Sequence, residues 1–172
     1  MSILEAIANN IGSIITGVFT IMAATWGARV SHNRTVINEV RKEKIIRIEQ
    51  ALKEGLKLRA ALTDFVVFMQ NNLDQGGDLF YQRDNNSAHE LMGLVNDTFE
   101  DVEFHIIMLD NEKVKAKFDD LANHYRRELC GFIEKNTNNV LLSDLNVVSI
   151  PLVYKAQVLL DTVQNELKNI IK

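Results

Sequence analysis

The stretch EKVKAKFDDLANHYRRELCGFIEK, residues 112–135, decides the fold class, because its apolar side chains recur at steps of three or four residues. The recurring positions are Val114, Phe118, Leu121, Tyr125, Leu129 and Phe132. This period places them on one side of an α-helix and leaves charged residues on the other side. Asp110 and Asn111 precede the stretch as a break and a cap, and residues 136–139 follow as a turn. We therefore predict one helix over residues 112–135.

The stretches before and after it show the same period. Residues 87–109 begin with Ser87 and Glu90 at the spacing of a capping box. Their expected buried positions are Leu91, Val95, Thr98, Val102, Ile106 and Leu109. The last helix is predicted to begin at Ser149 as its N-cap, with Pro151 in the first turn. Its expected buried positions are Val153, Ala156, Leu160, Val163, Leu167 and Ile170.

A long first helix is predicted over residues 29–72, which contain no proline and one glycine, Gly55. It can continue into the segment before it. Its apolar positions at helical spacing are Ile37, Ile45, Ile48, Leu52, Leu62, Phe65, Met69 and Leu73. The short apolar run at residues 140–142 is expected to cover one end of the bundle. The predicted fold class is all-α, with a four-helix, bundle-like domain and a long first helix.

Composition and charge divide the chain into three segments. With 47% hydrophobic residues in 172, the chain has enough apolar material for a core, which excludes a disordered chain. The lone cysteine, Cys130, excludes an internal disulfide and is expected in the core. Residues 1–28 carry one charge, residues 29–47 carry a net charge of +4, and residues 48–172 carry −7. We read these as a transmembrane segment, a basic juxtamembrane helix and a cytoplasmic helical bundle.

The uncharged run at residues 6–28 is predicted to span a membrane. As a helix it is ~34 Å long, which is enough for a hydrocarbon core of ~30 Å. Trp26 lies near the expected interface. The alternatives are a buried helix of a soluble protein and a signal peptide, although no basic n-region precedes the run. The basic flank predicts a single-pass protein of the cell inner membrane, with its N-terminus outside and its C-terminal domain in the cytoplasm.

The basic residues after the span are expected to contact the headgroups of anionic membrane lipid. We name this set the collar, and its members are Arg29, Arg34, Arg41, Lys42, Lys44 and Arg47.

A polar stripe runs along the predicted span, with Glu5, Asn9, Ser13, Thr16 and Thr20 at steps of three and four residues. Polar groups facing lipid would lack partners, so the stripe is expected to face another copy of the chain. In one interpretation four or more copies form a homo-oligomer around a polar lumen. In another the stripe packs helices across a dry interface. The pattern can also be accidental.

Catalytic chemistry is not predicted, because the chain lacks a glycine-rich phosphate loop, a nucleophile elbow and a metalloprotease motif. His105 and His124 each follow an aspartate by four residues, which does not match the Glu-x-x-His step of carboxylate-bridged metal sites. We therefore expect no enzyme, no cofactor and no metal. A basic patch is interpreted as a solvated face or an anionic-ligand or nucleic-acid contact, and comprises Lys113, Lys115, Lys117, Arg126 and Arg127.

The order of the parts, a polar-striped span at residues 6–28, the collar and a helical body to Lys172, resembles small transmembrane effectors of bacterial anti-phage systems of the Hailong type. The resemblance implies an oligomeric channel that a nucleic-acid or nucleotide signal releases. The expected function is a gated pore or membrane-disrupting effector controlled by the cytoplasmic domain. The resemblance implies that it acts in anti-phage defence. The alternative is a membrane-tethered adaptor whose bundle recruits a regulatory or other partner protein.

Overall fold

A computed structural model describes residues 3–76, 85–135 and 140–171 of the chain. Side chains are described from Thr20 onward within these ranges, apart from those of residues 21, 75, 76, 85 and 86. The described residues form helices and short connections and contain no strand. The elements are α1 (Ile3–Gly76), α2 (Asn85–Leu109), α3 (Glu112–Asn123), the π-helical segment η1 (His124–Cys130), α4 (Gly131–Lys135) and α5 (Leu142–Ile171).

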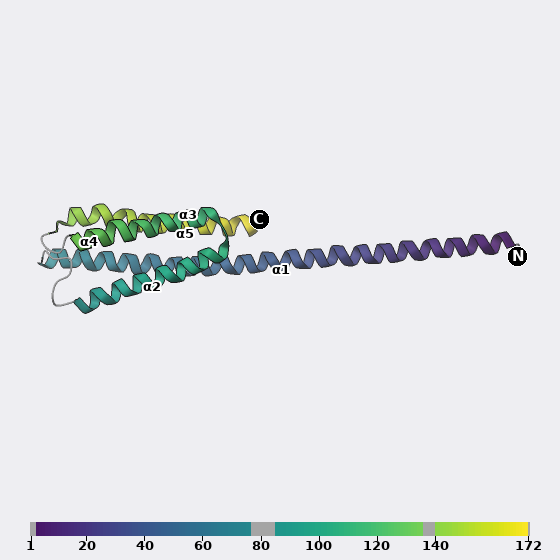
Figure 1. Cartoon of the computed structure of the whole chain (residues 1–172), viewed down its shortest axis with the longest axis horizontal. Helices are drawn as coiled ribbons and strands as arrows, with labels where there is room; N and C mark the ends of the chain where they lie inside the picture. Colours follow the sequence, from purple (N-terminus) through teal and green to yellow (C-terminus); the bar gives the residue numbers. More distant parts are fainter. Residues whose placement is uncertain (1–2, 77–84, 136–139, 172) are drawn as a thin grey trace. The chain divides into compact units, whose positions relative to one another are not determined.

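The chain forms two compact units, Met1–Glu43 and Lys44–Lys172. In the second unit, four helical rods lie side by side (Figure 1). They are the later part of α1, helix α2, the consecutive segments α3–η1–α4, and α5. The predicted all-α class, the four-helix bundle and the long first helix are confirmed.

One hydrophobic core fills the second unit. Each rod contributes fully buried side chains, among them Phe65 of α1, Val95 of α2, Leu121 of α3 and Leu152 of α5. Phe99 joins two rods, since its ring stacks on that of Tyr125 at a centroid distance of 4.8 Å. The predicted stripes are confirmed as buried at Ile48, Leu62, Phe65, Met69, Leu73, Val95, Thr98, Val102, Ile106, Leu109, Val114, Phe118, Leu121, Tyr125, Leu129, Ala156, Leu160 and Val163. Ile37, which lies in the first unit, is helical as predicted, and its side chain is 64% exposed.

The helix predicted over residues 112–135 contains a π-helical segment, His124–Cys130. Asn111 caps its start as expected, and its side chain accepts hydrogen bonds from the amides of Lys113 and Val114. Inward positions then follow at four-residue steps from Leu121 to Ile133. Four residues exceed one α-helical turn of 3.6 residues, so in an α-helix such positions would drift around the helix. The wider turn of the π-helix, with its i→i+5 hydrogen bonds, keeps them on the side that faces the core. As a result Ile133 is buried and Phe132 is only half-buried.

The predicted start of the last helix is wrong. Helix α5 begins at Leu142, so Ser149 and Pro151 lie inside it. Leu145 is fully buried, and its packing favours helix over the residues that precede the proline. The proline lacks an N–H and so cannot bond the carbonyl four residues earlier. In the short apolar run at residues 140–142, Val140 packs on the core, whereas Leu141 and Leu142 are exposed.

The other predicted boundaries shift less. Helix α2 begins at Asn85, two residues before the predicted cap. The first helix is continuous from Ile3 to Gly76, as the sequence allowed.

The membrane span predicted at residues 6–28 stays a prediction. In the described part of the chain, no helical stretch combines the length and the apolar character of a membrane crossing. The side chains of residues 3–19, which make up most of the predicted span, lie outside the described residues.

Candidate functional site

Large apolar side chains lie exposed on one side of α1 in the first unit. Met22, Trp26, Ile37 and Val40 are each between 59% and 74% exposed, and Val30 is 39% exposed. Steps of four, four, seven and three residues place them on one face of the helix. An apolar face of this kind indicates a surface for contact with another macromolecule or with lipid.

The polar stripe is helical at the backbone. The side chains of Glu5, Asn9, Ser13 and Thr16 lie outside the described residues, and that of Thr20 is exposed. The direction in which the stripe faces is therefore still a prediction.

The collar divides between the two units. Arg29, Arg34, Arg41 and Lys42 lie in the first unit and are exposed, and so is Lys44, where the second unit begins. Arg47 is half-buried, and its guanidinium Nη1 donates to the Met108 carbonyl at 3.0 Å. A cation at the carboxyl end of a helix satisfies a terminal carbonyl and complements the helix dipole. Arg47 therefore fastens the end of α2 to α1, a role that the sequence did not reveal.

The five residues of the basic patch are all exposed. Lys113 and Lys117 lie one turn apart on α3, and Lys115 points to another side of that helix. Arg126 and Arg127 follow on η1. The cations therefore lie on different exposed sides of this helical segment and do not converge on one point.

Histidines and carboxylates near this rod make structural contacts. The ring Nε2 of His124 lies 2.8 Å from the Val148 carbonyl of α5. The Asp120 carboxylate forms an ion pair with Lys155 at 2.5 Å. Within the described ranges, no group of three or more histidine, cysteine, aspartate or glutamate side chains is placed to hold a metal ion.

Cys130 lies half-buried beside Tyr125. Burial raises the pKa of the Cys130 thiol, and the contact with the Tyr125 hydroxyl offsets only part of this rise. Burial also raises the pKa of Tyr125, whose hydroxyl donates to Asn96 Oδ1 at 3.0 Å. A protonated thiol is a weak nucleophile, so the arrangement suits a packing role.

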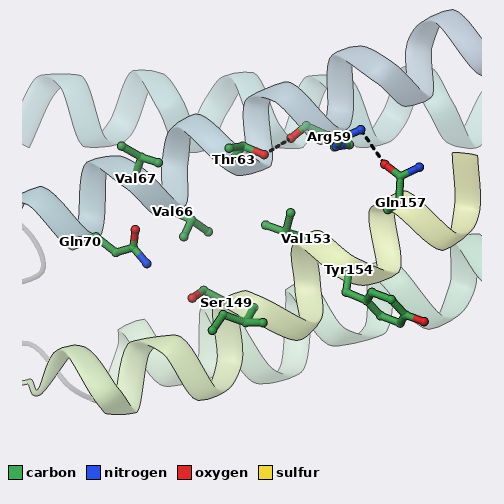
Figure 2. Close-up of a pocket in the computed structure, with 10 residues that line it drawn as sticks. Arg59, Thr63, Val66, Val67, Gln70, Ser149, Val153, Tyr154 and Gln157 are labelled. Carbon is green, nitrogen blue, oxygen red and sulfur yellow. Dashed lines mark hydrogen bonds between the residues drawn. The ribbon is translucent and has the colours of Figure 1, made fainter.

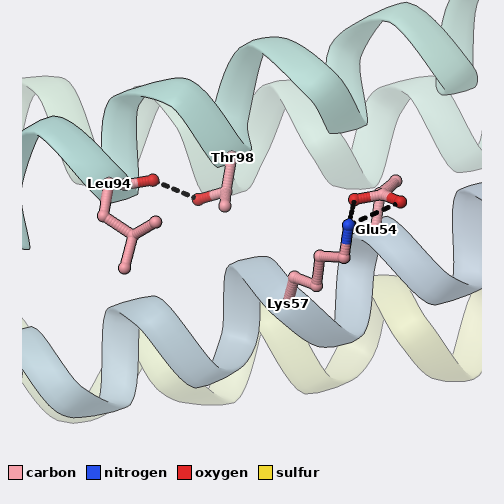
Figure 3. A network of polar contacts seen from close by, with 4 residues as sticks. All are labelled: Glu54, Lys57, Leu94 and Thr98. Carbon is pink, nitrogen blue, oxygen red and sulfur yellow. Dashed lines mark hydrogen bonds and ion pairs between the residues drawn. The ribbon is translucent and has the colours of Figure 1, made fainter.

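Polar groups between α1 and α2 bond locally (Figure 3). On α1, Lys57 Nζ lies 2.7 Å from Glu54 Oε2, one turn away. On α2, the Thr98 hydroxyl donates to the Leu94 carbonyl at 2.9 Å. Each of these contacts stays within one helix.

A groove between α1 and α5 has a volume of about 460 Å³ (Figure 2). Its walls come from Val66 and Val67 of α1 and from Ile150, Val153 and Tyr154 of α5. The sequence did not indicate this groove, because it depends on how α1 and α5 pair side by side.

Comparisons of the chain with protein-family models, with curated proteins and with solved structures find no match.

Proposed function

We propose that this chain is an oligomeric single-span membrane protein that acts as a gated pore or membrane-disrupting effector. The observation that carries the proposal is the continuity of α1, which runs from Ile3 through the collar to Gly76. Its later part contributes the buried residues Ile48, Leu62, Phe65 and Met69 to the core of the second unit. One continuous helix therefore joins that core to the predicted span, and a change in the packing of the core is transmitted along this helix.

The charge pattern supports the proposed orientation. The exposed collar cations bind anionic lipid headgroups on the inner side of the membrane, and the second unit lies in the cytoplasm. Each such cation near an anionic surface contributes about 1 kcal/mol.

The polar stripe supports the proposed pore. With four or more copies, Glu5 and Asn9 line the outer mouth, and the hydroxyls of Ser13, Thr16 and Thr20 line the lumen. The cytoplasmic unit controls conduction in response to a nucleic-acid or nucleotide signal or to a regulatory protein. The resemblance of the order of parts to anti-phage effectors supports a role of this activity in antiviral defence.

The alternative function is a membrane-tethered adaptor that recruits a partner protein. It is favoured by the exposed apolar residues Val147, Ile150 and Tyr154, which lie on one face of α5. A surface of this kind is typical of helix-mediated recognition.

Ion flux through vesicles distinguishes the two functions. The test variant replaces Asn9 by Leu, Ser13 by Leu, Thr16 by Val and Thr20 by Val. A lumen lined with apolar side chains dewets, so the variant should lose conduction while it still inserts. An adaptor requires only tethering, so its partner binding should be unchanged.

The matched control replaces four apolar residues on the opposite side of the helix, Ile7, Ile11, Ile14 and Val18, by Leu. This control should conduct like the wild type. Conduction by the wild type that the stripe variant matches contradicts a lumen along the stripe.

A further inference from the structure

The groove between α1 and α5 is elongated and has a polar pair at each end. At one end, Arg59 Nη1 donates to Gln157 Oε1 at 2.6 Å. At the other end, Gln70 Nε2 donates to Asn146 Oδ1 at 2.9 Å. Eleven residues separate the two pairs on each helix, which corresponds to ~16 Å along the antiparallel helices.

The walls between these pairs are apolar. Val66 is buried, Val67 is 45% exposed and Ile150 is 63% exposed. Val153 and Tyr154 continue the wall on α5 (Figure 2). The volume of about 460 Å³ lies in the range of about 300–1,000 Å³ that small-molecule sites occupy. An open apolar groove of this length suits an extended hydrocarbon chain.

Ser149 places an unpartnered polar atom at the floor of the groove. Its side chain is 0% exposed, and its hydroxyl oxygen has no hydrogen-bond partner. Figure 2 shows this hydroxyl on the side of α5 that faces α1. Buried hydroxyls in folded proteins are nearly always hydrogen-bonded, so this atom points to a ligand group. This oxygen is covered in the structure, so a ligand group reaches it when a side chain of the groove wall changes rotamer.

Arg59 is the one charged residue among those that line the groove. A guanidinium carries five N–H donors, and the bond to Gln157 uses one of them. Its single positive charge matches a single carboxylate, which it binds by two parallel hydrogen bonds. Eight residues of α5 separate Gln157 from Ser149, or ~12 Å.

We propose that this groove binds a fatty acid that carries a hydroxyl or carbonyl group remote from its carboxylate. The carboxylate binds Arg59, the hydrocarbon chain lies along Val66, Val67 and Val153, and the remote oxygen pairs with the Ser149 hydroxyl. The site lies within the second unit, so it does not depend on the proposed pore.

Photo-crosslinking of the full chain tests the site. The probe is 12-hydroxydodecanoate with a diazirine in its chain, and mass spectrometry identifies the labelled residues. Labelling should map to the groove walls, such as Val67, Ile150 and Tyr154. Unlabelled 12-hydroxydodecanoate should compete best, dodecanoate less well, and dodecanol least, because dodecanol lacks the carboxylate. Labelling confined to other surfaces, or equal competition by all three compounds, overturns the proposal.

Two variants identify the polar contacts. Arg59→Gln should weaken competition by either acid roughly 10-fold or more, as expected for a hydrogen bond to a charged group. Lys57→Gln, a charge removal outside the groove, should have no effect. Equal behaviour of these two variants contradicts the carboxylate contact.

Ser149→Ala should weaken competition by 12-hydroxydodecanoate roughly 3- to 10-fold and leave dodecanoate unchanged. The ligand pair makes this result specific, because a general loss of fold would affect both compounds. Ser143→Ala, an exposed serine on the same helix, serves as the matched control and should change neither. If Ser149→Ala weakens both compounds alike, or neither, the assigned hydroxyl contact is wrong.

Discussion

Phe118→Ala is expected to destabilise the second unit severely, because its buried ring packs against Phe99 in an aromatic cluster. Phe118 is 3% exposed. Its ring centroid lies 6.1 Å from that of Phe99, which stacks in turn on Tyr125. Truncation of a buried phenylalanine costs ~3–5 kcal/mol in unfolding free energy. The lost contact with Phe99 contributes ~0.5–1.5 kcal/mol beyond area burial, so we expect the upper part of that range.

Urea denaturation of residues 44–172, followed by circular dichroism, measures this change. The fragment should be predominantly helical, since the core lies within it. Phe104→Ala is the matched control, because that side chain is 60% exposed and its loss should change the free energy by less than ~0.5 kcal/mol. Similar midpoints for the two variants, or a strand-rich spectrum of the fragment, would refute the core described here.

Two further predictions concern the second unit. Arg47→Ala should lower its unfolding free energy by ~1 kcal/mol through loss of the bond to the last turn of α2, whereas Lys44→Ala, which removes an exposed cation, should be near neutral in the same urea titration. The raised pKa of Cys130 means that the folded state holds its proton more tightly than the unfolded state. The thiol therefore contributes stability below its ordinary pKa of 9.0, and this contribution is lost as the pH rises through that value toward the folded pKa. The stability advantage of wild type over Cys130→Ala should accordingly shrink above pH 9, and an advantage that grows with pH contradicts the burial of the thiol.

Helical periodicity was sufficient to predict many of the buried positions of the second unit. Residues such as Val95, Phe118, Leu121 and Val163 are buried where the three- and four-residue steps place them. These steps report a local property, the side of a helix on which a residue lies, and the core follows from bringing four such sides together.

Features that depend on contacts between helices were not predictable in this way. Pro151 indicated that the last helix starts at Ser149. Because Leu145 is buried, α5 instead begins seven residues earlier, at Leu142. The π-helical segment arises because buried residues recur every four positions along it. A regular α-helix would turn some of these residues away from the core, and this constraint exists only once the helix is packed. The bond from Arg47 to Met108 joins residues 61 positions apart, which no local pattern reveals.

The candidate site shows the same division. The count of charges along the sequence identified the collar cations. In the structure all of them except Arg47 are exposed. The groove between α1 and α5 was not predictable, since it depends on the antiparallel pairing of Arg59 with Gln157 and of Gln70 with Asn146.

Carbonate extraction of cell membranes tests the central claim, membrane residence through the span at residues 6–28, most directly. The full-length chain should remain in the membrane pellet after the wash, because 23 consecutive uncharged residues partition into the hydrocarbon core. The fragment 44–172, expressed in the same cells, should be released and so controls for trapping or aggregation. Recovery of the intact full-length chain in the carbonate supernatant would contradict a membrane span, and with it the proposed pore.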